Sequence, residues 1–250
     1  VIMSLKLKQE EHTKLDQKNV HSDSMWKKIS GIIVSPVQVF SSFSSKKEPF
    51  VKLLLLIAIL NVVFSVFITF ELELDKTIIQ SQQLSSDEVE LALKYAKIGT
   101  LISSVVMGFF APIISILFQA LLLTLIMLFA SKESGSYRQV LAVTTYSYMP
   151  ILINSILNMV IIGFGIIDAN MLLQEFSGKL VSLQILFDDL APVYSQILSN
   201  IELFSIWSVV LIGLGLSKVY NMKTKKGLLI SGFLWLVTTI VSAGFTLIVT

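Results

Sequence analysis

The 250-residue sequence has no cysteine, and its two histidines, His12 and His21, both lie close to its start. Without cysteine there is no disulfide, thiolate nucleophile or cysteine metal site. Neither an HExxH zinc motif nor a GxSxG serine-hydrolase motif occurs. We therefore expect a non-enzymatic protein that uses no cofactor and binds no metal.

Charged residues are also scarce: they make up 14% of the chain, whereas hydrophobic residues make up 54%. The net charge of +2 is too small to suggest a nucleic-acid partner. The mean hydropathy is +0.79, and long apolar runs replace the amphipathic patterns of a soluble domain. These features predict a polytopic membrane protein, with membrane lipid as its first partner.

Five apolar segments are long enough to be membrane spans. They cover residues 50–70, 98–130, 140–167, 203–219 and 227–249. A helix rises ~1.5 Å per residue, and the hydrocarbon core of a bilayer is ~30 Å thick. The segment 98–130 is too long for one perpendicular crossing and too short for two. The predicted fold is therefore all-α, a five-helix membrane bundle formed by residues 46–250.

The first 45 residues are predicted to lie outside this bundle. Residues 1–24 are polar and have no apolar face, which predicts a disordered cytoplasmic tail. Residues 25–45 carry apolar side chains at helical spacing, with Trp26 near their start, and predict amphipathic helices lying at the membrane interface. A helix packed under the bundle is the alternative.

The distribution of Lys and Arg predicts the orientation. Nine lie in the first 52 residues, two in the 131–138 loop and four from the end of the fourth span onward, against four in the loops 71–97 and 168–202. Because basic loops favour the cytoplasmic side, we expect a cytoplasmic N-terminus and an extracytoplasmic C-terminus in the cell membrane. Spaced apolar residues in the two outer loops predict amphipathic segments there. One helix is expected to start near Ser86 and to continue into the second span.

The predicted spans contain no Asp or Glu, but they contain uncharged polar groups. These are Asn61, Gln119, Tyr146, Ser147, Tyr148, Asn154 and Asn158. One interpretation is hydrogen bonding between helices, which contributes ~0.6–2 kcal/mol for each bond in a bilayer. The other is a polar groove that recognises a partner helix or a lipid headgroup. The absence of intramembrane carboxylates argues against a proton-coupled carrier.

Small residues and prolines predict how the spans pack. Pro112 and Pro150 are expected to kink their helices. Four small residues follow 4-3-4 spacing and predict a close-packing seam between helices. They are Ser104, Gly108, Ala111 and Ser115.

Three stretches of the sequence form a recognisable set. The first is Ser35-Pro36 followed by Phe40; the second is residues 137–143, leading through Tyr146 to Pro150. The third is residues 203–207, running to Leu214-Gly215-Leu216 and a lysine-rich loop. Together they resemble the Yip family of Ypt/Rab-GTPase-interacting membrane proteins, in its bacterial branch. The resemblance implies five spans, a cytoplasmic N-terminus and no known enzymatic activity. The Asp-Leu-Tyr-Gly-Pro-type element of eukaryotic members does not occur, so Rab binding is not implied.

Two hypotheses for the function follow. The first is a membrane protein that binds other integral membrane proteins, or a second copy of itself. The resemblance suggests an accessory subunit of an ABC-type efflux or toxin-protection complex. The alternative is a transporter or channel for a neutral or amphipathic solute near Pro112 and Pro150, which would require a water-accessible cavity at mid-depth.

Overall fold

The computed structural model describes residues 25–45, 50–72, 86–133, 135–174, 181–187 and 190–249. These residues form helices, with one isolated bridge between Ser182 and Glu202 and no longer strand among them. The predicted all-α class is therefore confirmed. The predicted tail, residues 1–24, lies outside the described residues.

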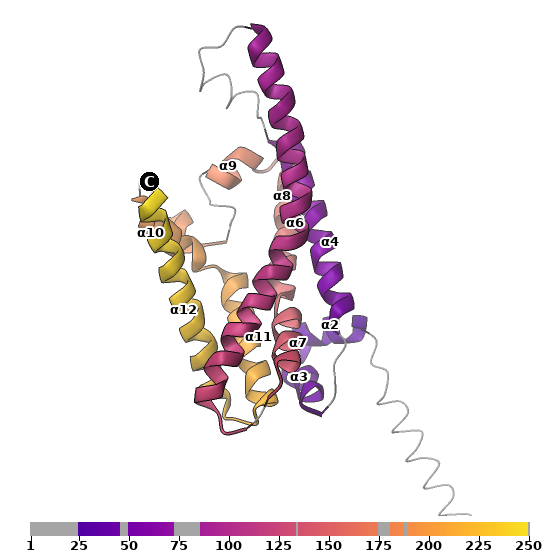
Figure 1. Cartoon of the computed structure of the whole chain (residues 1–250), viewed down its shortest axis with the longest axis vertical. Helices are drawn as coiled ribbons and strands as arrows, with labels where there is room; N and C mark the ends of the chain where they lie inside the picture. Colours follow the sequence, from indigo (N-terminus) through magenta and orange to yellow (C-terminus); the bar gives the residue numbers. More distant parts are fainter. Residues whose placement is uncertain are drawn as a thin grey trace, which may run out of the picture.

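Ten α-helices and one short 3-10 helix make up the described part of the chain (Figure 1). They are α2 (Met25–Val34), α3 (Pro36–Ser45), α4 (Val51–Glu71), α6 (Ser86–Ala130), α7 (Tyr137–Ser147), α8 (Met149–Gly163), α9 (Ala169–Gln174), η1 (Leu183–Leu186), α10 (Pro192–Asn200), α11 (Leu203–Val219) and α12 (Thr224–Val249).

Four helical regions are long and apolar enough to cross a membrane. They are Val51–Glu71, Glu90–Ala130, Tyr137–Gly163 and Thr224–Phe245. Helix α11 has the bounds predicted for the fourth span, but its 17 residues extend only about 25 Å. The protein is thus an all-helical membrane protein with several candidate spans, and the predicted count of five is not confirmed.

Helix α6 is the longest element, with 45 residues and a length of about 67 Å. It begins at Ser86, as predicted, and runs without interruption through Pro112. Figure 1 shows its first turns extending beyond the other helices of the bundle. The excess length of the second apolar segment is therefore taken up by one protruding helix rather than by a second crossing.

The third predicted span is not one continuous helix. Helix α7 ends at Ser147 and α8 begins at Met149, with Pro150 in the first turn of α8. The cause is local, because Pro150 has no N–H to donate to the carbonyl four residues earlier, that of Tyr146. Instead, the Tyr148 amide donates to the Thr145 carbonyl at 3.3 Å, which tightens the last turn of α7.

Helices α2 and α3 both contribute side chains to the core of the bundle. Ile32, Phe40 and Phe43 have no exposed surface and belong to the main hydrophobic cluster. Helix α3 packs mainly against α11 and also contacts α7. Helix α2 keeps Trp26 and Val34 exposed. The interfacial location of these helices stays a prediction.

Two connections that carry basic residues meet at one end of the bundle, beside α3. Figure 1 shows α3, the α6–α7 connection and the α11–α12 connection together at its lower end. The Lys226 ammonium donates to the carbonyl of Ala130, which joins the start of α12 to the last residue of α6. At the opposite end, α10 packs against α12, and the Asn200 amide donates to the Ser242 hydroxyl at 3.3 Å.

Candidate functional site

The start of α7 is joined to the end of α3 by one side chain. Ser136 and Gln139 form a capping box: the Ser136 hydroxyl accepts from the Gln139 amide, and the Ser136 amide donates to Gln139 Oε1 at 2.9 Å. The Gln139 Nε2 also donates to the carbonyl of Phe43 at 2.9 Å. The same residue therefore starts α7 and holds the C-terminal turn of α3 against it.

The second half of α7 is polar yet completely enclosed. The Thr144 and Thr145 hydroxyls donate to the Leu141 carbonyl at 3.0 and 2.7 Å, so their hydrogen bonds stay within the helix. The Tyr146 ring lies 5.1 Å from the Phe43 ring, centroid to centroid. Tyr146 and Ser147 both have 0% exposed surface. Since no water-sized space adjoins these residues, the cavity that a solute path requires is not found beside them.

At the break between α7 and α8, a backbone carbonyl accepts a hydrogen bond from a neighbouring helix. The Ile151 amide donates to the Tyr148 carbonyl rather than to the Ser147 carbonyl. The Ser147 carbonyl instead accepts from the Ser208 hydroxyl of α11 at 2.7 Å. A buried carbonyl without a donor would cost about 1–3 kcal/mol, so Ser208 stabilises the broken conformation.

Asn154 and Asn158 lie inside the bundle on α8. They are 7% and 2% exposed, respectively. The Asn154 Oδ1 and the Ser147 hydroxyl have no hydrogen-bond partner among the described residues. Buried polar atoms are nearly always paired, so this interior is an unusual feature of the fold.

The remaining predicted polar residues are placed differently. Asn61 on α4 is half-buried, and its Nδ2 donates to the Ile57 carbonyl of its own helix at 2.9 Å. Gln119 on α6 and Tyr148 at the break are also half-buried. Four of the predicted polar residues, all on α7 and α8, are therefore buried inside the bundle: Tyr146, Ser147, Asn154 and Asn158. Asn61 and Gln119 lie on other helices.

Comparison with known proteins was informative at the level of family. A family model described as the Yip1 domain matches residues 30–245. The chain belongs to the Yip1 domain family. No curated protein and no solved structure matches it. The match covers the bundle from within α2 to within α12, so the polar interior described above lies inside the Yip1 domain.

The small residues predicted to form one seam in this Yip1-domain protein do not share one environment. Gly108 is buried against α4, where an added Cβ would lie 3.0 Å from the Val62 Cα. Ser104 is half-buried, whereas Ala111 and Ser115 are exposed. At 3.6 residues per turn the four positions share one face of α6, but close contact with α4 is found at Gly108, whereas Ala111 and Ser115 on the same face are exposed.

The sequence analysis did not predict a close helix contact in the Yip1 domain. An added Cβ at Gly227 would lie 2.2 Å from the Gly213 carbonyl oxygen, and one at Gly213 would lie 2.8 Å from the Leu228 Cα. Helices α11 and α12 therefore touch backbone to backbone. The signal was present as Gly213 and Ser217 in α11 and Gly227 and Ser231 in α12, two pairs with a spacing of four.

The buried polar side chains of α7 and α8 are hydroxyls and amides. Within the described ranges, no group of three or more His, Cys, Asp or Glu side chains could hold a metal ion. The arrangement supplies hydrogen bonds and close packing around a helix break. That the protein is not an enzyme stays a prediction.

Proposed function

We propose that this Yip1-domain protein is a non-enzymatic membrane protein that binds other integral membrane proteins through one face of α6. The observation that carries the proposal is the exposure of Ala111 and Ser115, four residues apart on the longest helix. Small side chains let two helix backbones approach closely, which is how helices associate in lipid.

The surroundings of this pair suit a second helix. Met107, Ile114 and Phe118 are large, apolar and more than half exposed on the same helix. At 3.6 residues per turn their side chains all lie along one side of the surface over Ala111 and Ser115. A helix laid on this surface would gain packing contacts with them, and such contacts drive association when both partners are already in lipid.

The asparagines of α8 are poor candidates for partner recognition. Asn154 and Asn158 are almost fully buried by the chain itself, so a partner helix cannot reach them without disrupting the bundle. Substituting them would test folding rather than binding. The α6 face is the better target because its residues are exposed.

The proposal is tested by filling the shallow surface. The double variant Ala111→Leu, Ser115→Leu keeps α6 apolar and helical but removes the room for a second backbone. We expect the yield of co-purified membrane proteins in mild detergent to fall on the order of tenfold, equivalent to about 1.4 kcal/mol. Thr238→Leu, at an exposed position of α12, is the matched control and should change nothing. Equal recovery from the double variant and the wild type would contradict the proposal.

A narrower form of the proposal is an accessory subunit of an ABC-type efflux or toxin-protection complex in the cell membrane, with the N-terminus cytoplasmic. The resemblance to bacterial Yip relatives supports the accessory role in an ABC-type complex. The basic end of the bundle supports the cytoplasmic N-terminus. Mass spectrometry of the co-purified material distinguishes the partners. An ATPase with its permease supports the narrower form, whereas a second copy of this chain indicates a homo-oligomer.

A further inference from the structure

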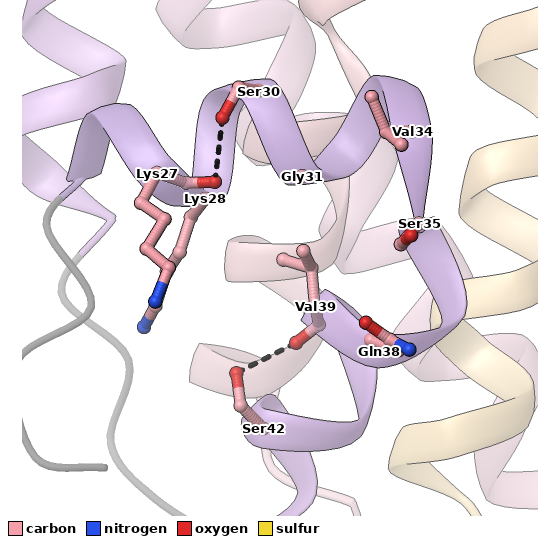
Figure 2. A pocket seen from close by; sticks show the side chains of 9 residues that line it. All are labelled: Lys27, Lys28, Ser30, Gly31, Val34, Ser35, Gln38, Val39 and Ser42. Carbon is pink, nitrogen blue, oxygen red and sulfur yellow. Dashed lines mark hydrogen bonds between the residues drawn. The ribbon is translucent and has the colours of Figure 1, made fainter. Parts of the chain in front are cut away.

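A cavity of about 400 Å³ lies between α2 and α3 (Figure 2). Its polar lining consists of Lys27, Lys28, Ser30, Ser35, Gln38 and Ser42. The volume is within the ~300–1,000 Å³ range of small-ligand sites. It lies on the outside of the bundle, whereas the polar interior of α7 and α8 is enclosed.

The cavity follows from the tight turn between the two helices. The Ser35 amide donates to the Gly31 carbonyl at 2.7 Å, and α3 begins at Pro36 directly afterwards. An added Cβ at Gly31 would lie 2.7 Å from a Val39 methyl group, so the helices touch at this point. Beyond this contact they diverge, as Figure 2 shows, which leaves a groove with polar walls.

Two lysines line the groove. Lys27 and Lys28 extend from the same side of α2 in Figure 2. The Lys28 ammonium also lies 5.9 Å from the centre of the Phe43 ring. The hydroxyls of Ser30 and Ser42 and the amide of Gln38 add hydrogen-bonding groups. This combination suits a phosphate group, because ammonium groups and neutral donors both stabilise its oxygens.

The surface around the groove is apolar. Trp26 is 63% exposed and Val34 80%, and Val37 is exposed as well. The groove also belongs to the end of the bundle where the basic connections meet (Figure 1). A free phosphate ion would make no favourable contact with the apolar surroundings. A lipid would make favourable contacts with both parts of the surface: its phosphate with the lysines, and its acyl chains with the exposed apolar side chains.

We propose that the α2–α3 groove binds the headgroup of an anionic phospholipid from the leaflet at the basic end of the bundle. The groove is separate from the exposed face of α6, so this inference does not depend on the partner binding proposed above. Lys27 and Lys28 supply the charge that selects anionic over zwitterionic lipid. The apolar surroundings select a lipid over a free anion.

The test is native mass spectrometry of the full-length protein titrated with phosphatidylglycerol or with phosphatidylcholine of the same acyl chains. We expect phosphatidylglycerol to bind at least about tenfold more tightly, and Lys27→Gln, Lys28→Gln to remove that preference. Lys27→Arg, Lys28→Arg should retain it. Lys223→Gln, Lys225→Gln removes two exposed charges from the same end of the bundle and is the matched control. Thermal unfolding of each variant checks that it is folded.

Several outcomes would overturn the proposal. Equal affinities for the two lipids would show that the groove does not distinguish an anionic from a zwitterionic headgroup. If the Lys223, Lys225 control lost the preference for phosphatidylglycerol to the same extent, the preference would come from the overall charge at this end of the bundle and not from the groove. Displacement of phosphatidylglycerol by millimolar inorganic phosphate would identify the ligand as a free anion.

Discussion

A missing side chain decides how closely α11 and α12 approach. Gly227 of α12 lies so near the Gly213 carbonyl that even a methyl group has no room. Gly215 has a similar role on another face of α11, where an added Cβ would lie 2.4 Å from a Val143 methyl group. Small residues thus allow α11 to contact α7 and α12 at the same time. In lipid such packing replaces the hydrophobic effect as the main force between helices.

Gly227→Ala is expected to force α11 and α12 apart and to destabilise the protein by about 1–3 kcal/mol, the usual cost of overpacking. A lower midpoint of thermal unfolding in detergent would show this. Gly232→Ala is the matched control on the same helix, because nothing lies within 4 Å of its added Cβ. The close contact would be refuted if the two variants unfolded at the same temperature.

Among the helices, α3 differs most from the expected architecture, because it packs against α11 and α7. The T-shaped pair of Phe40 and Phe43, with ring centroids 5.5 Å apart, enters the main hydrophobic cluster. The bond from Gln139 to the Phe43 carbonyl then ties the end of α3 to α7. Helix α3 is therefore part of the bundle, although its sequence is compatible with an interfacial helix.

Phe43→Ala should leave a cavity between α3, α7 and α11 and destabilise the protein by about 3–5 kcal/mol. The measurement is thermal or denaturant unfolding in detergent, combined with protease sensitivity near α3. Phe129→Ala removes the same atoms from a side chain that is 94% exposed, and should have little effect. If α3 only rested on the lipid surface, the two substitutions would behave alike.

At the scale of the whole molecule, the arrangement of charge predicts the orientation. The connections that carry Lys132, Arg138 and Lys223 to Lys226 meet at one end, and the protruding first turns of α6 lie at the other (Figure 1). This separation fits the positive-inside rule if the basic end is cytoplasmic. The groove between α2 and α3 would then face the inner leaflet, which carries anionic lipid.

Single cysteines can test this orientation directly, because the natural sequence contains none. With a membrane-impermeant maleimide applied to intact cells, Lys94→Cys on the protruding part of α6 should react. Lys225→Cys should react only after permeabilisation. Both positions are exposed in the structure, so burial does not explain a difference between them. The reverse pattern would place the basic end outside and remove the inner-leaflet lipid site.

The ends of some helices could be predicted from the sequence alone. The bounds of α11 and the start of α6 at Ser86 agree with the prediction, because apolar run length and end signals are local. The break at Tyr148 was only partly predictable. Pro150 removes a hydrogen bond wherever it occurs, but the Ser208 hydroxyl that satisfies the Ser147 carbonyl is 61 residues away.

Tertiary structure alone decided which face of each helix is inside. Gly108 packs on α4 while Ala111, three residues later, is exposed, and both fitted the same predicted seam. Similarly, Phe43 is buried and Trp26 is exposed, although both lie in a segment predicted to be interfacial. Lipid and protein interior are equally apolar, so hydrophobicity cannot separate the two faces; only the position of the neighbouring helices does.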